Sequence, residues 1–328
     1  MTAPLSSQAQ KLINRDRRTL ARSITKIEST RPDDRARAED LIDEILPYTG
    51  GSIRLGISGT PGVGKSTMID AFGVWLIQNG HRVAVLAVDP SSSITGGSIL
   101  GDKTRMTALS SRSESFIRPT PSGGAVGGVA RRTRDAMLLC EAAGFDVVIV
   151  ETMGVGQAET TVAEICDLFL LLVAPGGGDD LQGIKRGVME LADVVAVNKS
   201  DGKLLDQARH TAADYRQALH LMRPRWDGVT TSVLNISAHT GDGMAQLWET
   251  LSSTHAGLSD EGHLGALRSS QAVSQLRREF ESMVSERITR LPTFAKFQAN
   301  IERAVAEGTQ SPSKGAATLA QLAWRELS

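Results

Sequence analysis

The chain has 328 residues, of which 41% are hydrophobic and 22% are charged, and its formal net charge is −1. This composition is typical of a globular protein with a sizeable core, and the length suits one large α/β domain with additions. A net charge close to zero predicts no bulk attraction to nucleic acid or to an anionic membrane. The longest apolar run, "LFLLLVA" from Leu168, is too short to span a bilayer.

The N-terminal segment is basic and amphipathic. Leu12, Leu20 and Ile24 recur at helical spacing, and a second helical stretch follows at residues 33–46. The segment lacks the apolar core of a secretory signal, so we expect a helical arm over residues 1–50. The two cysteines, at positions 140 and 166, lie in apolar stretches and are expected to be buried thiols of a reducing compartment. We therefore expect a cytoplasmic protein.

The middle of the chain, residues 51–258, alternates between short apolar runs and helix-like stretches. The expected strands lie at 53–58, 83–88, 147–150, 168–173, 194–197 and 233–236. The expected helices between them include 65–79, 128–143, 203–221 and 243–256. Apolar strands joined by helices indicate an α/β fold with a mostly parallel sheet covered on both faces. After residue 258 only helical patterns follow, at 269–291, 294–307 and 311–327, and they predict a helical arm over residues 259–328.

The first expected strand runs directly into "GTPGVGKST", and a helix follows. This is the G-x-x-x-x-G-K-[ST] pattern of a phosphate-binding loop in its strand–loop–helix setting. Backbone N–H groups and the helix N-terminus would face the phosphates. Lys65 is expected to reach the β- and γ-phosphates as a catalytic residue, and the Ser66 hydroxyl to bind Mg²⁺. The nucleotide-binding residues predicted in this loop are Gly59, Gly62, Val63, Gly64, Lys65, Ser66 and Thr67.

The motif "NKSD" at the end of the fifth apolar run indicates which base is bound. The Asp201 carboxylate can accept hydrogen bonds from N1–H and the 2-amino group of guanine, and adenine offers neither donor there. GTP is therefore favoured over ATP. Lys199 can lie over the ring, and Asn198 can tie neighbouring loops together. The later stretch "ISAHTGDG" offers Ser237 and Ala238 as a second base-reading loop.

Two loops are expected to sense the γ-phosphate. One, "VIVETMGVGQAE", places Glu151 at a strand end and continues through Gly154, whose N–H can bond the γ-phosphate, to Gln157. The other, "AVDPSSSITGGSILGDKTRM", places Asp89 at a strand end and Asp102 beyond a Gly-Gly pair, where a solvated loop charge is the alternative. Carboxylates beside a triphosphate repel it unless Mg²⁺ lies between them. The predicted metal-side residues are Ser66, Asp89, Asp102 and Glu151, and the predicted catalytic residues are Lys65, Asp102, Glu151 and Gln157.

These motifs, together with "FIRPTPSGG" and "PGGGDDLQGIKRG", closely resemble the MeaB family of G proteins over residues 30–256. The family includes bacterial relatives of the human methylmalonic aciduria type A protein and was once described as ArgK-like transport kinases. The resemblance implies a P-loop GTPase that converts GTP to GDP and phosphate, slowly alone and faster with a partner. It also implies a third switch at residues 175–187, with Asp179, Gln182 and Lys185 as its polar contacts.

The resemblance further implies a partner. Members of the family act as metallochaperone-like switches for an adenosylcobalamin-dependent acyl-CoA mutase of the methylmalonyl-CoA mutase type. They gate cofactor loading from an adenosyltransferase, protect the mutase from inactivation, and form homodimers with the help of the C-terminal arm. The chain has no D-x-H-x-x-G stretch, so we expect cobalamin to bind to the partner and not to this chain.

Two other functions, a kinase and a GTPase that delivers another metal, are the alternatives. An ArgK-like kinase needs an acceptor site, and none can be assigned in the sequence. A GTPase that delivers another metal needs thiolate or imidazole clusters, and the two cysteines are isolated. Met153 and "SSSIT" depart from the family pattern, which leaves the acyl-CoA substrate of the client mutase open. The source of an arginine finger also stays open between Arg105 and an arginine of a partner.

Overall fold

The computed structural model of the chain describes residues 4–29, 31–89, 106–121, 126–152, 158–176, 186–226 and 228–327. The chain divides into two compact units, Met1–Gln271 and Ala272–Ser328. The three-part division expected from the sequence, with a helical arm on each side of a core, stays a prediction. None of the helices that the structure describes is both long and apolar enough to cross a membrane.

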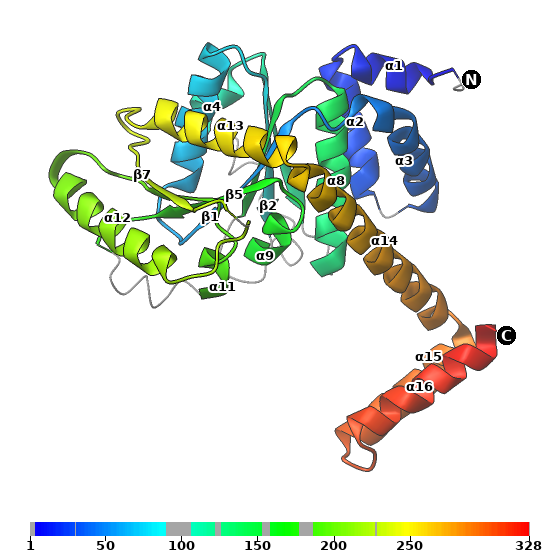
Figure 1. Cartoon of the computed structure of the whole chain (residues 1–328). Helices are drawn as coiled ribbons and strands as arrows, with labels where there is room; N and C mark the ends of the chain where they lie inside the picture. The colour runs from blue at the N-terminus through cyan, green and yellow to red at the C-terminus, as the bar shows by residue number, and fades with distance from the viewer. Residues whose placement is uncertain are drawn as a thin grey trace. The chain divides into compact units, whose positions relative to one another are not determined.

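In the described part of the chain, seven parallel strands form one sheet in the order β3-β2-β4-β1-β5-β6-β7 (Figure 1). The strands are β1 (Ile53–Gly59), β2 (Val83–Asp89), β3 (Ser115–Pro121), β4 (Val147–Thr152), β5 (Leu168–Val173), β6 (Val194–Val197) and β7 (Ser232–Asn235). Every residue of β4, β5 and β6 is buried, as expected for parallel strands covered on both faces. The α/β fold predicted from the sequence is confirmed.

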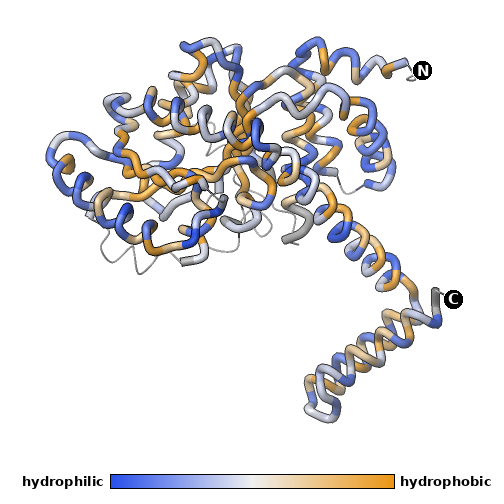
Figure 2. Tube along the Cα trace, viewed as in Figure 1, coloured by the Kyte–Doolittle hydropathy of each residue, from blue (hydrophilic) through white to orange (hydrophobic). Residues whose placement is uncertain are grey.

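Helices cover both faces of this sheet. One face packs on α4 (Lys65–Gln78), α7 (Thr107–Ser110) and α13 (Met244–Asp260). The elements of the other face are α1 (Ser7–Ile13), α2 (Arg17–Glu28), α3 (Pro32–Ile45), α8 (Val126–Ala142), α9 (Ala158–Ala163), α11 (Arg186–Met189) and α12 (Leu205–His220). Figure 2 shows the hydrophobic residues gathered in the strands between these two helix layers. Two short 3₁₀ turns, η1 (Leu46–Tyr48) and η2 (Gly202–Leu204), complete the unit.

Strand β3 is absent from the prediction made on the sequence. It contains Pro119 and Pro121, which lack an N–H to donate, and the charged Arg118, so it does not read as an apolar run. The sheet tolerates these residues because β3 is an edge strand that pairs only with β2. Arg118 forms an ion pair with Glu28 of α2, which ties the N-terminal helices to this edge.

The basic N-terminal stretch forms two helices and not the single one expected. Helix α1 ends at Ile13 with Asn14 as its C-cap, and Arg15 then adopts a left-handed conformation with φ 65°. The Asp16 carboxylate accepts the Thr19 N–H at 2.6 Å and so caps the new helix α2. The helix is interrupted here because Arg15 leaves the helical conformation and the next residue, Asp16, caps a new helix.

The second unit is helical throughout its described residues. Helix α14 (His263–Thr289) begins in the first unit and continues into the second, where α15 (Pro292–Ala306) and α16 (Pro312–Leu327) follow. Helices α15 and α16 pack closely at Gly315, where an added Cβ would lie 3.0 Å from Ile301. These bounds lie within a few residues of the C-terminal helices predicted from the sequence, except that α14 starts earlier.

Candidate nucleotide site

The phosphate loop lies between the end of β1 and the start of α4. Gly64 is the N-cap of α4 and has φ +92°, a left-handed conformation that favours glycine. A Cβ on Gly64 would also lie 2.9 Å from Nδ2 of Asn198. A Cβ on Gly59 would meet the Leu172 carbonyl oxygen at 2.3 Å. The loop therefore needs glycine at 59 and 64 for space, in addition to backbone freedom.

Lys65 is the first residue of α4, and its ammonium group lies over the loop. The Nζ atom donates to the carbonyl oxygens of Gly59 at 2.7 Å and Thr60 at 3.3 Å. A cation held at this position faces the space enclosed by the loop, next to the helix N-terminus. Both features favour an anion such as a phosphate.

The next residue connects the loop to β4. The Ser66 Oγ donates to Oε1 of Glu151 at 3.1 Å, and Glu151 is 2% exposed at the end of β4. A hydroxyl and a carboxylate are oxygen donors of the kind that Mg²⁺ prefers. The two residues predicted from separate motifs to lie on the metal side are thus brought together. Their role stays a prediction.

A pair of hydroxyl groups joins the ends of β1 and β4. Thr152 Oγ1 donates to Ser58 Oγ at 3.0 Å, and both side chains are fully buried. The strand register pairs Ile57 with Glu151, so Ser58 and Thr152 are the next residues along the two strands. Neither Ser58 nor Thr152 is predicted from the sequence, because one small polar residue beside a glycine-rich turn carries no distinctive pattern.

The base-reading motif after β6 contacts the phosphate loop directly. Asn198 donates from Nδ2 to the Val63 carbonyl oxygen at 3.0 Å and accepts the Ala238 N–H at 3.1 Å. Lys199 has φ 59° and donates from Nζ to the Gly62 carbonyl oxygen at 2.8 Å. These bonds join three loops, of which the phosphate loop lies more than a hundred residues before the other two in the chain.

The two remaining base-site residues are held by the same loops. Asp201 follows at the start of η2, where its side chain is half-buried. Ser237 is fully buried, and its Oγ accepts the N–H groups of His239 and Thr240 at 3.3 and 3.1 Å. The hydroxyl therefore shapes the turn that presents the Ala238 backbone.

Several predicted site residues cannot be placed. Asp89 ends β2, but its side chain is not among those described. The others lie outside the described residues: Asp102, Arg105, Met153, Gly154, Gln157, Asp179, Gln182 and Lys185. Thr67 lies in the first turn of α4 and is exposed.

At the opposite end of the sheet, three aspartates directly precede strands. Each accepts the backbone N–H of a residue on a neighbouring strand or at its start. Asp146 accepts from Arg82 at 2.7 Å, Asp167 from Arg54 at 2.9 Å and Asp193 from Phe169 at 2.7 Å. The sequence contains a pattern that could have predicted these contacts: an aspartate directly precedes three of the apolar runs, in "FDV", "CDL" and "ADV".

Asp167 and Asp193 are buried, and the surroundings shift their pKa values in opposite directions. Burial raises the pKa of Asp167, but the hydrogen bonds from Arg268 and the nearby imidazole of His255, 3.6 Å from the carboxylate, outweigh it and hold the pKa at about 2. Burial raises the pKa of Asp193 above its ordinary value, although Arg225 lies 2.6 Å from its carboxylate.

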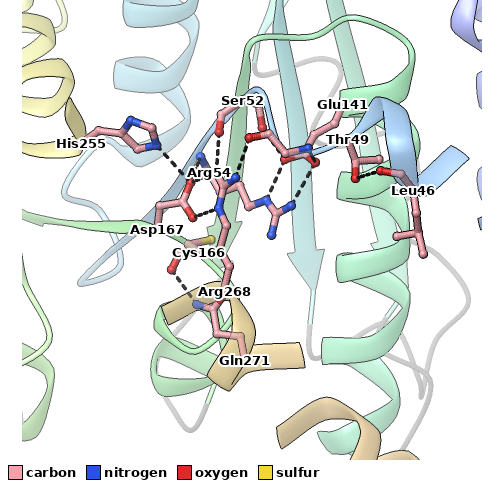
Figure 3. Close-up of polar contacts among 11 residues, drawn as sticks. Leu46, Thr49, Ser52, Arg54, Glu141, Cys166, Asp167, His255, Arg268 and Gln271 are labelled. Carbon is pink, nitrogen blue, oxygen red and sulfur yellow. Dashed lines mark hydrogen bonds and ion pairs between the residues drawn. The ribbon is translucent and has the colours of Figure 1, made fainter. Parts of the chain in front are cut away.

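A second ion pair fixes the start of β1 (Figure 3). Arg54 is 4% exposed and donates to both carboxylate oxygens of Glu141 on α8, at 2.7 and 3.0 Å. Glu141 also accepts from the Ser52 hydroxyl and from the Gly50 N–H. Every oxygen of this buried carboxylate is hydrogen-bonded, so the pair is structural and not a catalytic acid or base. The pKa of Glu141 is lowered, because these contacts outweigh burial, which would raise it.

The two cysteines are free and fully buried, as expected from the sequence. Burial raises the pKa of both Cys140 and Cys166. A protonated, enclosed thiol is neither a nucleophile nor a metal ligand.

Comparisons with known proteins agree with this geometry. A family model described as "Methylmalonyl Co-A mutase-associated GTPase MeaB" matches residues 20–293. GTPase ArgK of Escherichia coli (strain K12) is 45% identical over 319 residues, which cover 97% of this chain and 96% of that protein. The mouse protein named methylmalonic aciduria type A homolog, mitochondrial, is 41% identical over 336 residues, with 96% of this chain and 80% of that protein covered.

A solved structure is also similar. The crystal structure of a LAO/AO transport system kinase matches with a TM-score of 0.76 and 37% identity, and 98% of this chain and 99% of that chain are covered. The family match spans the phosphate loop, the Ser66–Glu151 contact and the base-reading motif described above. The chain therefore belongs to the MeaB family of methylmalonyl-CoA mutase-associated GTPases.

Proposed function

We propose that this chain is a GTP-hydrolysing switch that serves an adenosylcobalamin-dependent acyl-CoA mutase of the methylmalonyl-CoA mutase type. The observation that carries the GTPase part is the direct contact between the base reader and the phosphate loop, Lys199 Nζ to Gly62 O at 2.8 Å. The mutase part is supported by the family description and by the name of the mouse relative. The alternatives are an ArgK-like kinase and a GTPase that serves another metalloenzyme.

The chemistry follows from the arrangement of the site. Water attacks the γ-phosphorus, and the bond from this phosphorus to the β,γ-bridging oxygen breaks, which gives GDP and phosphate. Lys65 would hold the β- and γ-phosphates, and Asp201 would hold guanine. Ser66 and Glu151 fit Mg²⁺, which when bound neutralises phosphate charge. Asp89, Asp102 and Gln157 would complete the metal and water positions, and Gly154 would bond the γ-phosphate.

We infer that hydrolysis is slow in the isolated chain and faster with the mutase. The segment that would respond, residues 175–187, contains Asp179, Gln182 and Lys185, and Gly176 lies near its start. The Gly176 N–H donates to Thr211 Oγ1 at 3.1 Å, which anchors the start of the segment on α12. In this proposal the GTP state gates adenosylcobalamin loading from an adenosyltransferase onto the mutase and protects the mutase. The cobalamin binds the mutase and not this chain.

We also propose that the chain forms a homodimer through α14. Four exposed apolar residues of that helix follow coiled-coil spacing: Val273, Leu276, Phe280 and Met283. Their exposed fractions range from 47% to 68%, which is a large apolar stripe for a helix facing water. The cytoplasmic location stays a prediction.

GTP turnover by the purified protein, with and without a candidate mutase from the same genome, tests the proposal. Acceleration by the mutase supports the switch. Normal basal turnover that no candidate mutase accelerates would contradict the mutase role and leave the GTPase. Phosphate transfer from GTP to an added protein, with no free phosphate released, would favour the kinase alternative. Sedimentation of the wild type and of Phe280→Glu tests the dimer, which the charge should dissociate.

A further inference from the structure

Basic side chains gather on the two N-terminal helices and on the turn between them. We call this cluster the α1–α2 basic surface and define it by Lys11, Arg15, Arg17, Arg18 and Arg22. Residues 11–26 contain six cations and one acid, a net charge of +5, in a chain whose total charge is −1. All five defining side chains are exposed, and none forms an ion pair with any residue that the structure describes. The positive charge of this surface is therefore concentrated, and no ion pair with a described residue compensates it.

The acids nearest in sequence are already engaged. The Asp16 carboxylate accepts the Thr19 backbone N–H and caps α2. Glu28, at the other end of α2, forms its ion pair with Arg118 of β3. Neither acid forms an ion pair with the α1–α2 basic surface, so the fold leaves these arginines available for an external anion.

One guanidinium group of this surface, that of Arg17, and one beside it, that of Arg82, lie over aromatic rings. Arg17 lies over the Phe116 ring at 5.9 Å, and Arg82 lies over the Phe145 ring at 5.0 Å. The two rings are themselves 6.1 Å apart. Stacking reduces the rotamer freedom that a bound arginine must lose, so these cations are pre-organised for binding.

Arg15 lies beside these arginines in a backbone conformation that costs free energy. Its φ of 65° is left-handed, which costs a non-glycine residue roughly 1 kcal/mol. Its Nε lies 2.9 Å from the position that a Cβ on Gly144 would take, so glycine at 144 makes room for the guanidinium. Arg82 donates to the Gly144 carbonyl oxygen at 3.1 Å, which brings a third arginine to the same spot.

The positive charges gathered at this spot repel one another, and nearby acids offset that repulsion only in part. Burial lowers the pKa of Arg82, and the positive charges of Arg15 and Arg17 lower it further, against the opposing effect of Glu114 and Asp146. Like charges brought together repel each other, and a bound anion would relieve that repulsion.

We propose that the α1–α2 basic surface is a docking site for an acidic segment of a partner protein. Helix α2 has 12 residues and is about 18 Å long, which matches a short acidic helix or roughly five extended residues. Exposed guanidinium groups spread along this length can bind several carboxylates, each in a bidentate manner.

Nucleic acid fits this surface less well. Single-stranded nucleic acid is bound through bases stacked on exposed aromatic rings, but Phe116 and Phe145 are each only 5% exposed. The neighbouring helix α3 also exposes Asp33, Asp40 and Asp43, which would repel an anion longer than the surface. A short acidic protein segment meets neither obstacle.

The test uses the full chain and a fluorescein-labelled peptide of about eight glutamates, followed by anisotropy at low salt and at physiological salt. The substitution Arg15→Gln with Arg18→Gln and Arg22→Gln should weaken binding at least about tenfold, since each lost charge-assisted contact contributes to affinity. Salt should weaken wild-type binding, because the Debye length falls to about 8 Å at physiological ionic strength. Arg18→Gln with Arg22→Gln alone, on the solvent face of α2, tests the site without touching the strained turn.

The matched control removes three exposed cations elsewhere: Arg209→Gln, Arg223→Gln and Lys296→Gln. It should bind the peptide like the wild type, and all variants should keep wild-type GTP turnover. Absence of peptide binding by the wild type at low salt would overturn the proposal, as would equal losses in the control. Tighter binding of an oligonucleotide with the same number of charges, lost in the Arg18/Arg22 variant, would instead assign the surface to nucleic acid.

Discussion

Arg268 and Asp167 form two parallel hydrogen bonds, Nε to Oδ1 at 2.8 Å and Nη2 to Oδ2 at 2.7 Å (Figure 3). The same guanidinium donates to the carbonyl oxygens of Gly50 at 2.6 Å and Ser52 at 2.7 Å. Asp167 in turn accepts the Arg54 N–H of β1. The first turns of α14 are thereby tied to the start of the strand whose other end enters the phosphate loop.

The first prediction concerns the stability contributed by this pair. Asp167→Asn should lower the free energy of unfolding by about 3 kcal/mol, because breaking a buried ion pair leaves its partner uncompensated. Urea unfolding followed by fluorescence measures the change. Asp206→Asn is the matched control, since its carboxylate is 86% exposed and its ion pair with Arg209 should contribute little.

The second prediction concerns the pH dependence of the same pair. The pKa of Asp167 falls from 3.8 to about 2 on folding, so its stabilisation is fully present above pH 3.8 and is lost as the pH falls toward 2. The difference in stability between wild type and Asp167→Asn should therefore shrink by about 2 kcal/mol over that interval. Urea midpoints of both proteins across this range measure it. A difference that does not change with pH would contradict the assigned pKa.

The parts of this fold that the sequence predicted are those governed by regular patterns. Six of the strands appear as apolar runs, because strands covered on both faces need apolar residues throughout. The strand β3 was missed because Pro119 and Arg118 interrupt the pattern, and only its edge position makes them acceptable. The break between α1 and α2 was missed because it depends on one left-handed residue, Arg15.

In the nucleotide site, too, some features follow local sequence patterns and others depend on the tertiary fold. The phosphate loop and the motif proposed to read the base stand out in the sequence because their chemistry needs fixed residue types at fixed spacing. The contacts that join them, such as Asn198 to Val63, depend on loops brought together by the sheet order, which local patterns do not encode. The Ser58–Thr152 hydroxyl pair likewise becomes apparent only when β1 and β4 are neighbours.

The third prediction tests the metal side of the nucleotide site. Ser66→Ala should raise the Mg²⁺ concentration needed for GTP turnover by at least about tenfold, because it removes an oxygen ligand that pairs with Glu151. A Mg²⁺ titration of turnover measures the shift. Ser58→Ala is the control, since its hydroxyl is buried behind the site and should affect stability more than Mg²⁺ dependence. Equal Mg²⁺ curves for wild type and Ser66→Ala would rule out the assignment.

The fourth prediction tests the base reader. Asp201→Asn should reduce GTP affinity and turn the preference toward xanthine nucleotides, because the amide can donate where the carboxylate could only accept. Loss of guanine affinity by a factor on the order of 10² or more is expected from an unpaired polar group in the base site. Competition between GTP and XTP for the wild type and the variant measures the switch. The fold should be intact, which circular dichroism checks, and an unchanged preference for GTP would refute the role of Asp201.

The last prediction separates space from backbone freedom in the phosphate loop. Gly62 and Gly64 both have left-handed φ values, +81° and +92°. A Cβ on Gly62 would meet nothing within 4 Å, whereas a Cβ on Gly64 would lie 2.9 Å from Asn198 Nδ2. Gly62→Ala should therefore cost only the backbone strain of roughly 1 kcal/mol. Gly64→Ala should also push Asn198 away from Val63 and Ala238, which would disconnect the base reader from the loop.

Binding of a fluorescent GDP analogue to the two alanine variants distinguishes these costs. Affinity should fall much further for Gly64→Ala than for Gly62→Ala, and the loss should be partly relieved when Asn198→Ala is added to Gly64→Ala, since the shorter side chain removes the contact. The double variant still lacks the Asn198 hydrogen bonds, so recovery to the wild-type level is not expected. Similar losses in both single variants, with no relief from Asn198→Ala, would show that backbone strain and not the Asn198 contact explains the requirement for glycine at position 64.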